Sequence, residues 1–529
     1  MTTDVAAPRA GRREWVGLAV LALTAMLVSV DVFVLLLALP HLSADLGADS
    51  IEQLWIMDIY GFMVGGFLVT MGGLGDRIGR RKLLLIGAAA FGIASALAAY
   101  ATTPEMLIGA RALLGIAGAT LGPCTLALIS NMFRNPKQMG LAIGIWSAFF
   151  TVGAILGPII GGVLLAHFWW GSVFLINIPV MAVLLVFGPV LLPEFKSPAG
   201  GRIDLISVGM SLAAILPFVY GFKELAKNGF ELVPVLAVVV GIVFGVLFVL
   251  RQRTLADPLL DLSLFKNSVF TVGLVSLLAY SLLTGAVMML ATQYFQLVDG
   301  LGSLAAGLAL LPGMAVSTVA VLVSPILARR VRPAYLISGG LLIVAVGLLL
   351  MTQAASSGGS GLLILGFAVW CLGGGPLLSL GIGQVIGSAP PEKAGAAASM
   401  PQISNELGAA MGFAIIGSVG AIVYRSTLAV PAGVPSGTAD AARESLAGAT
   451  TAANGLPGDV AGQLLAAARE AFTSGLHTAA LISAVVLAGV GVLFFVKCRH
   501  IGALGAPAEE APPAPADEAP EPVSGTPAG

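Results

Sequence analysis

The stretch Trp15–Leu39, WVGLAVLALTAMLVSVDVFVLLLAL, contains 25 residues, of which Asp31 alone is charged. A helix needs about 20 apolar residues to cross the roughly 30 Å hydrocarbon core of a membrane. The stretch is therefore long enough to span a membrane, and it is too long for the core of a signal peptide. No small-residue cleavage site follows it, so we expect it to be retained as the first span.

The composition extends this interpretation to the whole chain. Of the 529 residues, 57% are hydrophobic and 10% are charged, and the mean hydropathy is +0.98. A soluble globular protein carries roughly 25% charged residues, so most of this surface is unsuited to water. Apolar stretches of spanning length recur, and we predict an all-α integral membrane protein with fourteen spans at residues 15–39, 54–73, 83–101, 106–130, 140–165, 172–192, 204–222, 232–250, 269–293, 304–327, 334–352, 361–387, 394–424 and 475–496.

The distribution of Lys and Arg predicts which helix ends face the cytoplasm, because cytoplasmic loops carry an excess of basic residues. With the N-terminus inside, the inner segments hold 20 of the 26 Lys and Arg residues, and Arg111 alone lies within a span. The other five fall in outer loops, namely Lys223, Lys227, Arg425, Arg443 and Arg469. Since the number of spans is even, we expect both termini in the cytoplasm.

The order of the spans indicates two related halves. The basic loop after the second span, residues 77–82, has a counterpart after the tenth, residues 329–332. Many secondary transporters consist of two such halves, with the substrate site between them near the membrane midplane. We therefore divide the chain into an N-terminal segment 1–13, a first six-helix half 14–203, an inserted helix pair with linker 204–268, a second six-helix half 269–497 with an outer loop 425–474, and a disordered cytoplasmic tail 498–529.

The informative residues are the ionisable ones inside predicted spans: Asp31, Asp58, Glu406 and Arg111. Each costs roughly 2.5–3.5 kcal/mol at a helix centre, so such residues indicate function. The residues one turn away from Asp31 are apolar, so its own helix offers it no partner. In a medium of low dielectric constant a carboxylate holds a proton more readily, and once ionised it attracts an organic cation. Competition between a proton and an organic cation for the Asp31 carboxylate would be an antiport mechanism. The alternative is that Asp31 forms an ion pair with Arg111 that only stabilises the structure.

Other polar residues are candidates for the lining of a central cavity. Gln402 and Glu406 are one helical turn apart and share a polar stripe, and Asn405 lies beside them. The many small residues around them equally indicate close packing of helices. We expect Asp58 near the outer membrane interface, where water would reach it.

Three aromatic residues could bind a cation over the faces of their rings, namely Trp55, Tyr60 and Trp146. Packing or anchoring at the membrane surface is the more common role of a single aromatic residue in such a chain.

A charged, glycine-rich loop follows the second predicted span, with the sequence GGLGDRIGRRK over residues 72–82. Glycines permit a tight turn there, and the charges could hold one conformation through breakable ion pairs, although simple anchoring in the cytoplasm is an alternative. The loop closely resembles the hallmark loop of the major facilitator superfamily, through Gly72, Asp76, Arg77, Gly79 and Arg80. The resemblance implies the major facilitator fold, with a loop that stabilises the outward-open state.

The fifth predicted span carries a second glycine motif, made of Gly153, Gly157, Pro158, Gly161 and Gly162. Gly153, Gly157 and Gly161 are spaced by four residues, so they lie in one groove of the helix, and Pro158 bends the helix. In this position the motif resembles the antiporter signature of exporters in the superfamily.

Further motifs narrow the resemblance to the fourteen-span drug:proton antiporters. Residues 31–40 resemble the first-span motif of that family, and Arg111 resembles an arginine implicated in proton handling. Residues 53–60, QLWIMDIY, are similar to the second-span opening of bacterial multidrug exporters of the QacA, SmvA and LfrA type. The resemblance implies that the three buried acids recognise cations and couple protons. It also implies export of quaternary ammonium compounds, dyes and fluoroquinolones across the bacterial plasma membrane.

We therefore predict a proton-coupled antiporter for amphiphilic cations, and not an enzyme. No cofactor is expected, because the chain lacks the Gly-Lys loop that binds the phosphates of ATP. The spacing of the histidines does not indicate a metal site, and a net charge of −1 does not indicate binding to nucleic acid. The expected partners are the substrate, protons and the lipid bilayer, with the protein a monomer. One alternative is an exporter of a neutral or anionic secondary metabolite or antibiotic. Another is an integral membrane enzyme or a channel.

Overall fold

The computed structural model describes residues 10–133, 135–194, 196, 204–228, 231–255, 258, 262–389 and 394–500. Helices account for nearly all of these residues, and no strand occurs among them. Thirteen helices in the described part are long and apolar enough to cross a membrane. The remaining predicted span, 54–73, forms α2 (Ser50–Ile78), which packs inside the bundle against α4 and α15. The prediction of an all-α membrane protein with about fourteen spans is confirmed.

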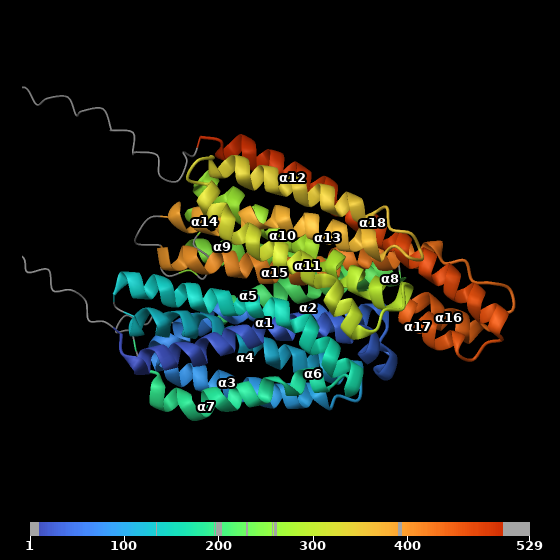
Figure 1. Ribbon diagram of the computed structural model, residues 1–529, viewed down its shortest axis with the longest axis horizontal. Coiled ribbons are helices and arrows are strands. Elements are labelled where there is room, and N and C mark those ends of the chain that lie inside the picture. Colours follow the sequence, from blue (N-terminus) through green and yellow to red (C-terminus); the bar gives the residue numbers. More distant parts are fainter. Residues whose placement is uncertain are drawn as a thin grey trace, which may run out of the picture.

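The first half of the chain forms one side of the bundle (Figure 1). Its helices are α1 (Arg12–Leu46), α2, α3 (Arg80–Ala99), α4 (Pro104–Met132), α5 (Pro136–His167), α6 (Ser172–Leu175) and α7 (Asn177–Leu191). The sixth predicted span is thus divided at Ile176, and the second piece begins with a polar residue, Asn177.

The second half forms the other side of the bundle (Figure 1). It comprises α10 (Ser268–Gln293) with a π-helical turn Tyr294–Val298, α11 (Ser303–Leu327), α12 (Pro333–Met351), α13 (Ser360–Pro376), α14 (Ile382–Gly387), α15 (Ala394–Thr427) and α18 (Gly458–Cys498). Two short helices, α16 (Ser436–Glu444) and α17 (Leu446–Ala453), lie between α15 and α18 at one end of the bundle. Helix α18 begins inside the segment expected to be loop. Most of the predicted tail, 501–529, lies outside the described residues.

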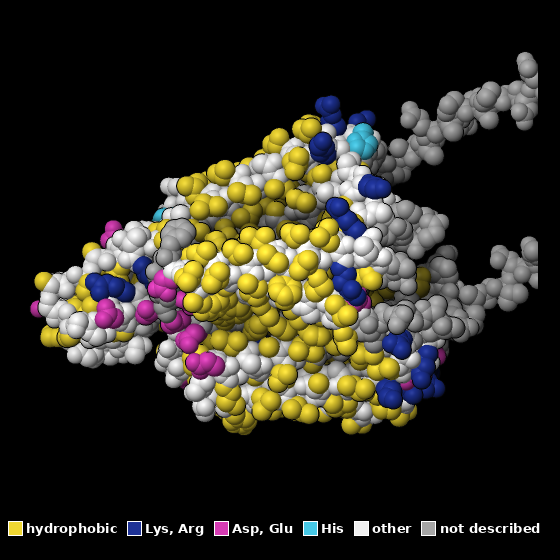
Figure 2. Space-filling view, turned by 180° about the vertical axis from the view of Figure 1, so that it is seen from behind, with side chains coloured by type: hydrophobic (Ala, Val, Ile, Leu, Met, Phe, Trp, Pro, Cys, Tyr) yellow, Lys and Arg dark blue, Asp and Glu magenta, His cyan; other side chains and the backbone are white. Residues whose placement is uncertain are grey.

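The two ends of the bundle differ in charge. Figure 2 shows a broad hydrophobic belt, with Lys and Arg gathered at one end and the lobe of α16 and α17 at the other. We call these the basic end and the loop end. The loops 77–82 and 329–332 lie at the basic end, together with the start of α1 and the end of α18. This arrangement is that of a protein whose apolar middle lies in a lipid bilayer.

The halves contact each other mainly through two helix pairs, α5 with α11 and α2 with α15. Both contacts use small residues. A Cβ atom on Gly162 of α5 would lie 2.5 Å from the Cα atom of Leu304, and one on Gly61 of α2 would lie 3.1 Å from the Cβ of Ala410. The α5–α11 contact is close to the loop end, because α5 ends and α11 begins there. The halves are therefore closed against each other at the loop end.

The inserted helices α8 (Leu205–Asn228) and α9 (Leu232–Thr254) pack against each other. Only 11% of the most apolar part of α9 is buried, so this helix faces lipid. Helix α8 contacts both α2 and α15. A separate hydrophobic cluster forms where the three helices meet, composed of Phe62, Val219, Ala410 and Ala414. Helix α8 thus lies along the seam between the two halves.

Candidate functional site

The first buried charge pair lies entirely within the first half. Arg111 of α4 donates from Nη1 to Oδ2 of Asp31 on α1 at 3.0 Å, and both side chains are 2% exposed. Asn177 of α7 donates from Nδ2 to the other carboxylate oxygen at 2.8 Å and to Ser95 Oγ at 3.0 Å. Two other helices, α4 and α7, therefore supply the partners of this carboxylate, and Ser95 of α3 supports Asn177. Asp31 does not face an open cavity, since its side chain is buried, and Arg111 neutralises its charge.

Close packing of α2 on α4 holds Arg111 in place. Its Nε donates to the carbonyl of Ile56 at 3.3 Å, and its guanidinium carbon lies 4.7 Å from the centre of the Tyr60 ring. A Cβ atom on Gly115 would lie 2.6 Å from the Tyr60 carbonyl oxygen, so only glycine permits this approach. Gly115, one helical turn after Arg111, therefore allows the Tyr60 ring to reach the guanidinium group.

The second pair joins the first half to the inserted helices. Lys223 of α8 donates from Nζ to Oδ2 of Asp58 at 2.6 Å, and both side chains are fully buried. The same Nζ lies 4.0 Å from the centre of the Trp55 ring, which provides a cation–π contact. The prediction of Lys223 in an outer loop is wrong, as is that of a partly hydrated Asp58. Helix α8 continues past the expected end at residue 222 and buries the lysine.

Glu406 of α15 is the acid without a basic partner. Its Oε1 accepts a hydrogen bond from Gln402 Nε2 at 2.9 Å, and no ion pair to it occurs in the described part of the chain. The side chains of Gln402 and Asn405 are exposed, while Ser281 Oγ donates to the backbone carbonyl of Asn405 at 2.7 Å. A Cβ on Gly61 of α2 would lie 3.9 Å from Glu406 Oε2. Glu406 therefore lies at the seam between the halves.

Tyr60 connects the first pair to the seam. The charges of Glu406, Asp31 and Arg111 all act on its phenol group, which is buried. A Cβ on Gly118 would lie 2.9 Å from the Tyr60 hydroxyl oxygen, so α4 also holds the far end of the ring. Trp146 on α5 is half-buried, and its indole Nε1 has no acceptor among the described residues.

The glycine motif on α5 allows close contact with two helices, α1 in the same half and α11 in the other half. A Cβ on Gly153 would overlap the carbonyl oxygen of Met26, and those on Gly157 and Gly161 would lie 2.8 Å and 3.3 Å from atoms of Phe33 and Val34 on α1. These three glycines line one groove for α1. Gly162 instead faces α11 in the other half, and the carbonyl of Pro158 lies against Gly307 there.

The predicted loop 72–82 forms a tight junction between two helices, because α2 extends to Ile78 and α3 begins at Arg80. Gly79 separates α2 from α3 with a φ of +111°, a conformation that favours glycine. Arg81 donates from Nη1 to the carbonyls of Pro189 and Leu192 at 3.0 Å each, and its Nε lies 3.5 Å from Glu194 Oε2. The loop therefore clasps the end of α7.

The other residues of this loop are placed as follows. Arg80 packs over Gly75, Arg77 is exposed, and Gly72 faces Pro123 of α4. The side chain of Asp76 lies outside the described residues.

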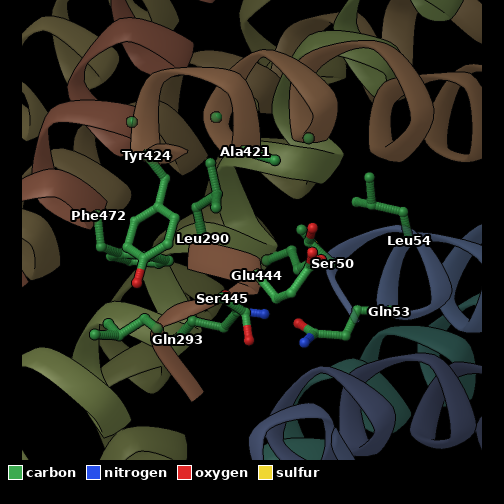
Figure 3. A pocket seen from close by; sticks show the side chains of 15 residues that line it. Ser50, Gln53, Leu54, Leu290, Gln293, Ala421, Tyr424, Glu444, Ser445 and Phe472 are labelled. Atoms are coloured by element: carbon green, nitrogen blue, oxygen red, sulfur yellow. The ribbon is translucent and has the colours of Figure 1, made fainter. Parts of the chain in front are cut away.

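A small pocket of about 50 Å³ opens at the loop end of the seam (Figure 3). Its walls come from α2, α10, α15, α18 and the segment joining α16 to α17, and the labelled side chains include Gln53, Gln293, Tyr424, Glu444 and Phe472. Next to it, Arg425 of α15 contacts Ser50 Oγ at 3.2 Å and Glu444 Oε2 at 3.1 Å. The short helices are thereby fastened to both halves.

Two residues of the site were missed from the sequence. Asn177 carries an amide inside a predicted span, and that signal was available in an otherwise apolar segment. Lys223 directly follows the apolar run 204–222 that predicts the seventh span, so the sequence places it in the adjoining loop. No group of three possible metal ligands occurs among the described residues.

Comparison with known proteins agrees with these motifs and this fold. The family model of the Major Facilitator Superfamily matches residues 21–413. The chain belongs to the major facilitator superfamily. It is thus a transporter of this superfamily and a multi-pass protein of the bacterial inner membrane, and the resemblance seen in its sequence is confirmed.

Several relatives of this superfamily member align over nearly their whole length. The multidrug efflux pump LfrA of Mycolicibacterium smegmatis is 44% identical over 491 residues, which cover 92% of this chain and 97% of that protein. The methyl viologen resistance protein SmvA of Salmonella typhimurium is 35% identical over 494 residues, 91% and 98% of the two chains. The tetracenomycin C resistance and export protein of Streptomyces glaucescens is 30% identical over 497 residues, 92% of each chain.

Solved structures of the superfamily share the fold. A bacterial homologue of the human lysosomal transporter Spinster, in an inward-facing and unoccupied conformation, superposes with a TM-score of 0.64. The match covers 93% of this chain and 98% of that one at 15% identity, so it concerns the fold alone.

Proposed function

We propose that this protein exports amphiphilic organic cations from the cytoplasm in exchange for protons. The observation that carries the proposal is Glu406, an acid at the seam of the two halves that has no basic partner among the described residues. The names of the relatives support it, since LfrA is a multidrug efflux pump and SmvA a methyl viologen resistance protein. Quaternary ammonium compounds, dyes and fluoroquinolones are the substrate classes to test first.

The balance of charge makes Glu406 the exchange site. Arg111 neutralises Asp31, and Lys223 neutralises Asp58. Of these three acids, Glu406 is the one with no basic partner among the described residues, so its ionisation leaves a negative charge at the seam. In a medium of low dielectric constant such a charge requires a counter-ion, which is either a proton or a bound cation. Binding of one therefore expels the other, and transport of one positive charge is coupled to one proton.

The neighbouring groups guide this exchange. Gln402 orients the carboxylate through its hydrogen bond, and the exposed side chain of Asn405, next to Glu406 in the chain, offers a polar contact to a cation. Trp146 stays a candidate for an aromatic contact with the cation. Tyr60 feels the charges of both Glu406 and the Asp31–Arg111 pair. Arg111, whose guanidinium carbon lies 4.7 Å from the centre of the Tyr60 ring, would tune proton handling at the seam through Tyr60.

Alternating access would expose Glu406 to the two sides in turn. We assign the basic end to the cytoplasm, with both termini there, because basic loops are retained inside. The halves are in contact at the loop end, so this conformation would receive substrate from the basic end. Rocking of the halves would separate Gly162 from Leu304 and open the loop end, while Arg81, at the start of α3, holds the end of α7 and keeps the first half rigid. The protein would act as a monomer.

The test is ethidium transport into everted membrane vesicles energised by a proton gradient. We expect transport by the wild type to stop when a protonophore is added. We expect Glu406→Gln to lose at least about 90% of the gradient-driven rate, because loss of the exchanging charge removes a contribution of more than 1.4 kcal/mol. Glu470→Gln removes an exposed acid from the loop-end part of α18 and is the matched control. Full gradient-driven transport by Glu406→Gln would overturn the proposal.

A second function is favoured by other relatives. Besides the tetracenomycin C export protein, a probable actinorhodin transporter of Streptomyces coelicolor is 33% identical over 430 residues. Export of a neutral or anionic secondary metabolite or antibiotic would not need Glu406 to carry a negative charge. Competition of such a compound with ethidium in the wild type, together with its normal transport by Glu406→Gln, would support this alternative.

A further inference from the structure

The inserted helix α8 brings a positive charge to the place where α2 and α15 meet. Lys223 forms its ion pair with Asp58 at 2.6 Å, and no part of either side chain is exposed. Around the pair lies the apolar cluster of Phe62 and Val219, with the ring of Trp55 over the ammonium group. In a buried pair of this kind each partner neutralises the other, and removal of one leaves the other charge uncompensated. Lys223 therefore cancels the charge of Asp58.

Asp58 lies close to the exchange site. It precedes Gly61 by three residues on α2, so the two positions are neighbours on one face of the helix, about 5–6 Å apart. Glu406 lies against Gly61 across the seam, since a Cβ there would be 3.9 Å from its Oε2. Two carboxylates thus border one stretch of the seam, about one helical turn apart, and only one of them is neutralised.

One oxygen of Asp58 is unsatisfied. Its Oδ1 is buried and has no hydrogen-bond donor in the described part of the chain. A buried acceptor without a donor costs free energy, and a positively charged ligand group would relieve that cost. If the lysine were absent, Asp58 would resemble Glu406, an acid that holds a proton while the site is empty and releases it when a cation arrives.

We propose that Lys223 is a specificity-determining residue that restricts transport to singly charged cations by withholding Asp58 from the site. This inference rests on the proposed exchange at Glu406. In the wild type, one acid releases one proton as one positive charge binds. In a protein that lacks the lysine, two acids release two protons as a cation with two positive charges binds, so charge is balanced in both cases.

The test compares ethidium with propidium, dyes that share the phenanthridinium ring but carry one and two positive charges. The full-length wild type and Lys223→Met are reconstituted into liposomes, and the uptake of each dye is driven by an imposed proton gradient. We expect Lys223→Met to raise the ratio of propidium to ethidium transport about tenfold or more, because an added charge at this separation acts through an effective dielectric constant of about 20. Protons released per propidium should rise from one toward two.

Three variants serve as controls. The double variant Asp58→Asn with Lys223→Met removes both charges, so the ratio should return to that of the wild type. Arg251→Met removes another base of the inserted pair, one that contacts Asp204 at the basic end, and should leave the ratio unchanged. Asp58→Asn alone leaves the lysine positive beside the seam, so it should lower propidium transport more than ethidium transport. This variant keeps the test decisive if Lys223→Met does not fold.

The outcomes separate the inference from the function on which it rests. If Lys223→Met transports ethidium but its ratio stays at the wild-type value, the role of Lys223 is refuted and exchange at Glu406 stands. Propidium transport by the wild type at the ethidium rate would refute it as well. If the wild type shows no gradient-driven ethidium transport, the proposed function itself fails.

Discussion

The interior of the first half and the seam between the halves contain the same chemical group in opposite situations. Asp31 and Glu406 are both carboxylates on apolar helices. Asp31 has a guanidinium at 3.0 Å and an amide at 2.8 Å, all supplied by helices of one half. Among the described residues Glu406 has only the hydrogen bond from a glutamine of its own helix, and its other neighbour, α2, belongs to the opposite half. A carboxylate with permanent partners stabilises a rigid body, whereas one at a moving boundary is free to exchange ions.

The largest expected effect is a loss of folding stability when Asp31 loses its partner. Arg111→Met leaves Asp31 buried without its counter-charge, and we expect a loss of about 3–5 kcal/mol in the free energy of unfolding. The double variant Asp31→Leu with Arg111→Met removes both charges and should recover most of that loss. Glu406→Gln removes a side chain without an ionic partner and should leave the unfolding temperature nearly unchanged.

Thermal unfolding of the purified protein in detergent, followed by intrinsic fluorescence, measures these differences. A stable Arg111→Met protein, or a double variant no better than the single one, would break the distinction between the paired acid and the exchanging acid.

A medium effect concerns the glycines of α5, which face both regions. Gly153→Ala inserts a methyl group against the carbonyl of Met26 inside the first half, and we expect it to cost about 1–3 kcal/mol of stability. Gly162→Ala inserts a methyl group 2.5 Å from the Cα atom of Leu304 in the other half. That contact exists only while the loop end is closed, so the variant should change transport more than unfolding temperature.

Gly144→Ala is the control on the same helix, because a Cβ there meets nothing within 4 Å. Unfolding temperature and ethidium transport are measured for all three variants. Equal losses of stability in Gly153→Ala and Gly162→Ala would show that the seam is as rigid as the interior.

The smallest effect on stability is expected at the basic end, where an ion pair joins the inserted helices α8 and α9. In this pair Arg251 Nη2 lies 3.0 Å from Asp204 Oδ1. Burial raises the pKa of Asp204, but hydrogen bonds from Ser207 and Arg251 outweigh burial, so the pKa lies below its usual value. A lowered pKa stabilises the fold above the pKa of the unfolded chain, about 4, and that contribution is lost as the pH falls further. Asp204→Asn should therefore cost less than about 1 kcal/mol, since Arg251 is partly exposed.

The pH dependence gives the sign of this effect. Between pH 5 and 8 the difference in unfolding temperature between the wild type and Asp204→Asn should be constant, and below about pH 4 it should shrink. A difference that grows as the pH falls would contradict the assignment.

Much of the architecture follows from linear patterns that water and lipid impose. The apolar runs predict the helices because every backbone group inside a membrane must be satisfied within its own segment. The motif at residues 72–82 indicates the superfamily, since its glycine at position 79 adopts a φ of +111° that few other residues tolerate. The ends of helices were harder to predict. The seventh span continues past residue 222, because a lysine that finds a carboxylate in the fold no longer needs to reach water.

By itself, the sequence determined that this chain is a bundle of membrane helices with a few acids that are costly to bury. Those properties depend on composition and spacing, which are local. Only the tertiary structure decided which acids are neutralised. Asp31 meets Arg111 across 80 positions of the chain, and Asp58 meets Lys223 across 165. Electrostatic partnership depends on distance in space, which no local pattern specifies, and it is what distinguishes Glu406 from the other two acids.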